Sequence, residues 1–94
     1  MDKYQIYAEK LKAIAHPHRL KIIEGLLNDE CNVTHIVKCM AMPQATVSQH
    51  LRILKSAGII EGRRDKMNIC YKVVDRNIKK IFKDLLGKSG DKEE

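Results

Sequence analysis

The chain has 94 residues, of which 44% are hydrophobic, so it has the length of one domain and the composition of a globular protein rather than a disordered one. Its 18 Lys and Arg residues against 12 Asp and Glu give a formal net charge of +6, which favours a polyanionic partner such as nucleic acid. No apolar run reaches the roughly 20 residues that span a bilayer, so we expect no membrane partner. Because the N-terminus lacks a secretion signal and the odd number of cysteines fits no disulfide framework, we expect a cytoplasmic protein.

The spacing of apolar residues predicts three helices in the first half of the chain. Tyr7, Leu11 and Ile14 recur at helical spacing in the opening segment, which ends at HPHR because the residue before a proline is pushed out of helical geometry. Pro17 suits the first turn of a second helix, which closes at NDECN. A short third helix is predicted from about Val33 to Met40, where AMP ends it.

The second half of the chain predicts a longer helix, a β-hairpin and a final helix. The fourth helix starts at Pro43 or Gln44 and runs to Gly58, a residue suited to the left-handed conformation after a helix end. The runs IIEGRR and NICYKVV, separated by DKM, predict a hairpin. The final helix begins near Asp75, a good N-cap residue, and carries a clean apolar stripe.

These elements predict a mainly α protein with a small β-hairpin. We expect one domain over residues 1–86 and a charged, flexible tail over residues 87–94. A short helix, a three-residue turn and a longer helix form a helix-turn-helix, and the basic hairpin that follows would be a wing. The predicted fold is therefore a winged helix-turn-helix.

This fold predicts which side chains would touch DNA. The second helix of the motif presents polar side chains to base edges in the major groove, and a wing tip meets phosphates or the minor groove. Helix capping and solvation would explain each polar group singly, but their joint occurrence in this order favours DNA binding. The expected DNA-binding residues are Gln44, Thr46, Ser48, Gln49, His50 and Arg52 of the helix, and Arg63, Arg64 and Lys66 of the hairpin.

Three segments carry a family resemblance over about residues 7–86. LKAIAHPHRLKIIEGLL, MPQATVSQHLRILKSAGIIEGRRD and YKV resemble the ArsR/SmtB family of bacterial winged-helix repressors, and NVTHIVKCMAMPQATVSQHL is more similar to PagR-like members than to the metal sensors. The resemblance implies a homodimer that binds a palindromic DNA operator and blocks transcription until an inducer binds. The sequence leaves the inducer open.

The final helix gives an independent reason to expect a homodimer. Five large apolar residues on one helix of a short chain are buried most economically against the first helix and the symmetry-related pair. The alternative is that this face closes the core of the monomer. The expected interface residues are Tyr7, Leu11, Ile78, Ile81, Phe82 and Leu85.

The resemblance also locates the two usual metal sites of the family, and both lack ligands here. The first uses ELCVCDL on the third helix, where this chain has ECNVTHI and so places Asn32 and Thr34 at the ligand positions. The second uses an Asp and a His at the start of the last helix, where this chain has Asp75 and Asn77, and no histidine follows His50. We therefore expect no metal at these sites and no cofactor.

Other residues leave two kinds of sensing open. Cys31 is the expected redox residue because a helix N-terminus lowers the pKa of a thiol, although two neighbouring acidic residues oppose this. Cys39 lies about 12 Å farther along a helix, too far for a disulfide, and like Cys70 it is expected to be a small buried hydrophobe. His35 lies four residues from both Cys31 and Cys39, which would suit a non-standard metal site.

The remaining histidines do not suggest a catalytic or metal site, and the sequence shows no catalytic arrangement. His16 and His18 flank a turn and are expected to be hydrogen-bonding or exposed groups. No nucleophile is paired with a base and an orienting acid, so an enzyme is not expected. The sequence predicts a homodimeric transcriptional repressor, with a protein-binding winged-helix module as the alternative, and with thiol or non-standard metal sensing as a variant of the first.

Overall fold

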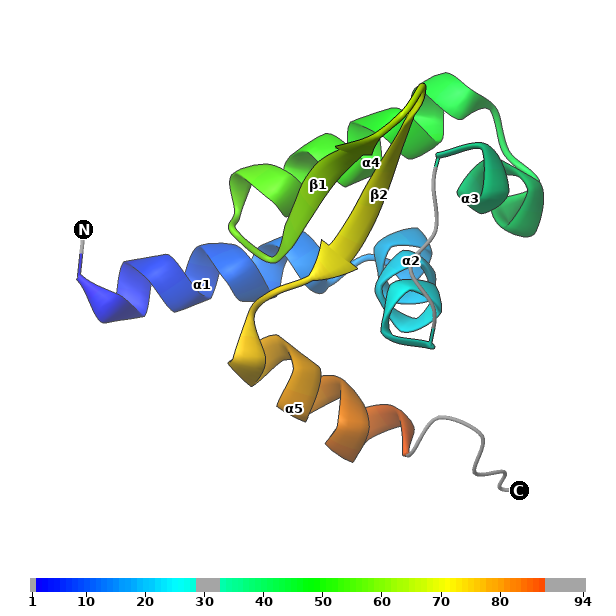
Figure 1. The fold of residues 1–94 in the computed structure, drawn as a ribbon. Helices are drawn as coiled ribbons and strands as arrows, with labels where there is room; N and C mark the ends of the chain where they lie inside the picture. Colours follow the sequence, from blue (N-terminus) through cyan, green and yellow to red (C-terminus); the bar gives the residue numbers. More distant parts are fainter. Residues whose placement is uncertain (1, 29–32, 88–94) are drawn as a thin grey trace.

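The computed structural model describes residues 2–28 and 33–87, and within them five helices and one β-hairpin form the fold (Figure 1). The elements in chain order are α1 (Lys3–Ile14), α2 (Pro17–Asn28), α3 (Val33–Met40), α4 (Gln44–Ser56), β1 (Ile60–Asp65), β2 (Asn68–Val73) and α5 (Arg76–Leu86). The predicted mainly helical class and the predicted order of elements are confirmed. Cys31, Asn32 and the predicted tail beyond Gly87 lie outside the described residues.

Local side-chain chemistry fixes the ends of the helices. Asp2 and Gln5 form a capping box at the start of α1, in which the carboxylate of Asp2 accepts a hydrogen bond from the backbone amide of Gln5 at 2.9 Å. The carboxylate of Asp75 accepts from the backbone amides of Asn77 and Ile78 at 2.9 and 3.0 Å, which confirms it as the N-cap of α5. Gly58 has a φ of 78° just after α4, the left-handed conformation expected of it.

The hairpin has a defined register, which the sequence had left open. Ile60 pairs with Val73 and Asp65 pairs with Asn68, so Lys66 and Met67 form a two-residue turn. Lys66 adopts a φ of 59°, a conformation that residues other than glycine rarely adopt. The hairpin thus closes without a glycine at its tip.

Every element described contributes to one hydrophobic core. In Figure 1, α4 and the hairpin lie on one side of the molecule, α5 lies on the other, and α1 and α2 lie between them. None of the helices within residues 2–28 and 33–87 is long and apolar enough to cross a membrane. The buried apolar side chains are Ala13, Ile14, Ile22, Ile23, Leu26, Ile36, Val47, Leu51, Leu54, Ile59, Ile60, Val73, Ile78 and Phe82.

Two of the six expected interface residues belong to this core. Ile78 and Phe82 are 1% and 2% exposed within a single chain, so the expectation that a second subunit covers them is wrong. They lie on the part of the apolar stripe of α5 that packs into the core of the monomer, which was the alternative to a dimer interface. Leu85 remains 70% exposed at the end of the stripe, and Ile81 is half-buried at the edge of the core.

Candidate nucleic-acid interface

The turn between α3 and α4 consists of Ala41, Met42 and Pro43, and it sets the direction of α4. Ala41 has a φ of 55°, and its amide donates to the carbonyl oxygen of Val37 at 2.9 Å, so α3 ends in a left-handed residue. The carbonyl oxygen of Pro43 then accepts from the amides of Thr46 and Val47, at 3.1 and 3.2 Å. This short turn places two helices in the arrangement of a helix-turn-helix.

One face of α4 is fixed in the core and the opposite face is open to solvent. Val47, Leu51 and Leu54 are buried at i, i+4 and i+7. Because a helix advances about 100° per residue, Gln49 points away from these three side chains and Arg52 lies beside it on the exposed side. The exposed side chains among those expected to touch DNA are Gln44, Thr46, Gln49 and Arg52, and Ser48 is half-buried.

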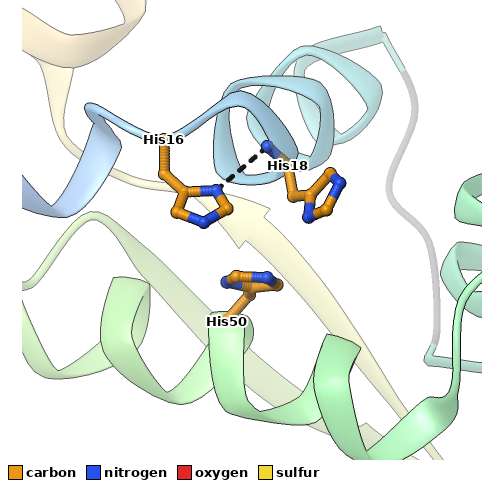
Figure 2. A group of neighbouring side chains, drawn as sticks. All are labelled: His16, His18 and His50. Atoms are coloured by element: carbon orange, nitrogen blue, oxygen red, sulfur yellow. Dashed lines mark hydrogen bonds between the residues drawn. The ribbon is translucent and has the colours of Figure 1, made fainter.

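His50 does not belong to the exposed face, which corrects its assignment as a DNA-binding residue. It is only 9% exposed, since it lies three residues after Val47 and one before Leu51 on the side of α4 that packs inward. Figure 2 shows its ring facing the side chains of His16 and His18 at the start of α2. The ring centroid of His50 lies 4.8 Å from that of His16 and 5.7 Å from that of His18.

Arg19 fixes the protonation pattern of His50. Its Nε donates a hydrogen bond to Nδ1 of His50 at 3.2 Å, so Nδ1 carries no proton and Nε2 carries it in the neutral ring. Burial, followed by electrostatic interactions with His16, Arg19 and His18, lowers the pKa of His50 and favours the neutral form at neutral pH. His50 therefore acts as a neutral hydrogen-bonding residue that connects α4 to α2.

The three basic residues expected at the wing are exposed on the hairpin. β1 contacts α4, and in the view of Figure 1 the hairpin runs along this helix. Arg63 pairs with Cys70, and Arg64 pairs with Ile69. Because side chains alternate along a strand, Arg63 and Arg64 project from opposite faces of the hairpin, whereas Lys66 lies in its turn.

The face of the hairpin that carries Arg64 is the one that continues into the core. Gly62 lies on the same face, opposite Tyr71, and Tyr71 packs against the core. A Cβ atom at Gly62 would lie 2.9 Å from Cγ2 of Ile69 and 3.0 Å from Cε1 of Tyr71, so the close cross-strand packing requires glycine here. Arg64 therefore extends the inner face of the hairpin and Arg63 its outer face.

The expected sensing residues are only partly described. Cys31, the expected redox residue, lies outside the described residues. Cys39 is exposed on α3, which corrects the expectation that it is buried, while Cys70 is half-buried. His35 is exposed on α3. Asn77, at a ligand position of the usual family site on the last helix, donates from Nδ2 to the hydroxyl of Tyr7 at 2.9 Å.

The sequence pattern did not predict that His16, His18 and His50 lie close together. The first two were assigned to a turn and the third to the DNA side of a helix, so no reason emerged to bring them together. The available signal was the position of His50 on the same side of the helix as Val47 and Leu51. A histidine on that side points inward, and only the packing of α2 against α4 decides what it meets.

The sequence of this chain is similar to those of bacterial transcriptional regulators. The sequence model of bacterial regulatory proteins of the arsR family matches residues 16–61. The transcriptional repressor PagR of Bacillus anthracis is 38% identical over 77 residues, which are 81% of this chain and 77% of PagR. The HTH-type transcriptional repressor SmtB of Mycobacterium tuberculosis is 35% identical over 83 residues, or 88% of this chain, and the matched part spans 62% of that longer relative.

Solved structures agree with the sequence comparison. The crystal structure of PagR matches with a TM-score of 0.79 and 36% identity, over 87% of this chain and 94% of PagR. The solution structure of the homodimeric winged helix-turn-helix DNA-binding domain of Mb0332 from Mycobacterium bovis matches with a TM-score of 0.82 and 29% identity, over 88% of this chain and 77% of that one. The predicted winged helix-turn-helix fold is thereby confirmed.

Proposed function

We propose that this chain, which belongs to the arsR family of bacterial regulatory proteins, represses transcription by binding double-stranded DNA as a homodimer. The observation that carries the proposal is the division of α4 into a buried apolar face and an exposed polar face that follows a short turn. A helix held in this way can enter the major groove without losing its packing. As a DNA-binding regulator and not an enzyme, the protein would act in the cytoplasm.

The exposed face of α4 has the chemistry of base recognition. Gln49 carries an amide that can donate to and accept from one adenine, and Arg52 can donate two hydrogen bonds to a guanine or reach a phosphate. Gln44, Thr46 and Ser48 supply shorter polar groups at the start of the helix. Within the described residues no side chain caps the start of α4, which favours contact between its N-terminal amides and phosphate oxygens.

The hairpin would supply the electrostatic part of the binding. Arg63, Arg64 and Lys66 are exposed on an element that contacts α4, and each can neutralise one phosphate. This placement of charge favours DNA over a protein partner, because it puts cations beside a polar helix face rather than beside an apolar patch. The wing would therefore set affinity, and α4 would set the sequence preference.

Exposed apolar side chains at α1 and at the end of α5 support a homodimer. Tyr7 and Leu11 of α1 are 41% and 48% exposed, and Leu85 of α5 protrudes farther. Lys10 forms an ion pair with Asp75 in the same region, which ties α1 to the start of α5. Covering these side chains in a symmetric dimer would remove apolar surface from water, and the dimer would present two α4 helices to the two halves of a palindromic operator.

A gel-shift titration would test the proposed function directly. The purified protein should retard DNA taken from the region flanking its own gene, and excess unrelated DNA should not abolish the retarded band. Gln49→Ala should weaken that band, because it removes the amide aimed at base edges. Retardation that unrelated DNA abolishes completely would contradict a sequence-specific regulator and leave only binding to the phosphate backbone.

A further inference from the structure

We propose that His16, His18 and His50, here called the histidine cluster, bind one divalent transition-metal ion of the kind that prefers imidazole ligands, such as zinc. The three side chains lie together in Figure 2: His16 immediately precedes α2, His18 lies in its first turn, and His50 lies on α4. Their ligand nitrogens all lie within 4.8 Å of one another. This site is separate from both usual metal sites of the family and goes beyond the proposed DNA-binding function.

The chemistry of the ligands selects the class of metal. Neutral imidazole is a borderline donor that suits zinc, cobalt, nickel and copper, whereas magnesium and calcium prefer carboxylate and carbonyl oxygens. Three histidines with one position left for water are a known ligand set for zinc. His16 and His18 are half-buried, so an ion can reach the cluster from solvent, while the buried His50 closes its inner side.

The separation of the nitrogens is within reach of coordination by side-chain rotation. Zinc binds histidine nitrogen at about 2.0–2.1 Å, which puts two nitrogens of a tetrahedral site about 3.3 Å apart. The greatest nitrogen separation in the cluster is 4.8 Å, so the rings need to approach by about 1.5 Å at most. His16 and His18 can rotate toward His50 because they are only partly enclosed, and neither helix has to move.

Two hydrogen bonds compete with the metal. Nδ1 of His16 accepts from the backbone amide of His18 at 3.1 Å, and Nδ1 of His50 accepts from Nε of Arg19 at 3.2 Å. Each bond occupies Nδ1 and leaves the proton on Nε2, so we take Nε2, the nitrogen that neither bond uses, as the ligand atom of both rings. Coordination through Nε2 therefore requires the proton to move to Nδ1 in both rings, which ends both hydrogen bonds.

This competition gives the site a distinctive signature. The guanidinium of Arg19 is a neighbouring cation, so the affinity should be lower than that of an isolated site with three histidines. Metal binding should also change the tautomers of His16 and His50 from the Nε2–H form to the Nδ1–H form. No such change is expected in His35, which lies on α3 and outside the cluster.

Zinc chloride titrated into the reduced, chelator-treated full chain would test the proposal. Calorimetry should give one zinc ion per chain, and nitrogen-resolved NMR of the imidazole rings should report the tautomer change in His16 and His50. Replacement of one ligand, His18→Asn, should weaken zinc binding on the order of tenfold or more. The matched control His35→Asn should bind zinc as the parent does. Bound cobalt should lack the absorption that thiolate ligands produce.

Several results would overturn the proposal. Failure of the folded parent to bind zinc would do so, as would equal zinc affinities in His18→Asn and the parent. Loss of binding in His35→Asn, or thiolate absorption in the cobalt form, would assign the metal to α3 and its cysteine instead. If His18→Asn does not fold by circular dichroism, the tautomers of the zinc-bound parent decide alone: unchanged Nε2–H forms of His16 and His50 exclude the site.

Discussion

Arg19 donates a hydrogen bond from Nε to Nδ1 of His50 at 3.2 Å, and these two residues are 31 positions apart in the chain. Nη1 of the same guanidinium donates to the carbonyl oxygen of Ala13 at 2.9 Å. One side chain therefore connects the end of α1 and the start of α2 to the buried face of α4. Together with the buried apolar face of α4, this link holds the helix that is proposed to enter DNA.

Removal of the link should lower stability. Arg19→Ala loses two hydrogen bonds, each worth about 0.5–1.5 kcal/mol, and leaves two partly enclosed acceptors, so the free energy of unfolding should fall by about 1–3 kcal/mol. Urea denaturation followed by circular dichroism measures this change. Arg52→Ala is the matched control, because an exposed arginine of α4 should change stability by less than about 0.5 kcal/mol while weakening DNA binding. Equal stabilities of the Arg19→Ala protein and the parent would show that the link is not structural.

The contact between Lys10 and Asp75 should make stability depend on pH in the acid range. Burial acts to raise the pKa of Asp75, but hydrogen bonds from Lys10 and from the amides of Ile78 and Asn77, with the charge of Lys10, outweigh it and lower the pKa below its ordinary value of 3.8. A lowered pKa contributes stability that is complete above the unfolded value and is lost as pH falls through the folded value.

Asp75→Asn tests whether the ionised carboxylate stabilises the protein above its pKa. The variant should be less stable than the parent near neutral pH, where the carboxylate is ionised and caps α5. The difference in the free energy of unfolding should shrink as pH falls below about 4, because the parent then loses the same charge. Urea titrations of both proteins at a series of pH values measure it. A difference that stays constant down to strongly acidic pH would contradict the role of the ionised carboxylate.

The two wing arginines should affect DNA binding unequally. They project from opposite faces of the hairpin, so one DNA surface cannot meet both in the same way. If Arg63→Ala or Arg64→Ala removes a phosphate contact, that substitution should weaken binding to all DNA sequences. It should also reduce the slope of the logarithm of the binding constant against the logarithm of the salt concentration by about 1. Lys83→Ala on α5, on the far side of the molecule, should leave the slope unchanged. Unchanged slopes in both arginine variants would remove the wing from the DNA-contact surface.

The dimer face and the monomer core can be separated by two substitutions in α5. Leu85→Asp places a charge on an exposed side chain, so it should leave the monomer folded but abolish the dimer, because a buried unpaired charge is prohibitive at an interface. Phe82→Ala removes a buried ring and should lower the free energy of unfolding by about 3–5 kcal/mol. Light scattering reports the first effect and urea denaturation the second. A folded Leu85→Asp dimer would exclude this end of α5 from the interface.

Much of the fold followed from the sequence because its signals are local. Pro17, Gly58 and Asp75 mark helix ends through backbone geometry and capping, and the structure has all three in those roles. The order of helices and hairpin then followed. The hairpin register did not, because Lys66 and Met67 offer no glycine signal for the turn, and the close packing of Ile69 and Tyr71 around Gly62 is a contact between strands that the sequence alone does not show.

The orientation of particular side chains could not be predicted so well, because it depends on contacts distant in sequence. His50 was predicted to contact DNA because its ring is polar, although its spacing from Val47 and Leu51 puts it on the inward side of the helix. Its partners, Arg19 and the start of α2, become visible only when α2 packs on α4. Phe82 shows the same limit, because one apolar stripe serves the monomer core and an exposed face at once.

Genome-wide footprinting of the bound protein would test directly whether paired copies of α4 read a two-fold symmetric DNA site. We expect discrete protected sites, each with two inverted half-sites whose centres lie about one helical turn, or a multiple of about 10–10.5 base pairs, apart. The same sites should lose protection in cells that carry Gln49→Ala. Protection spread without sequence preference, or sites without two-fold symmetry, would contradict it.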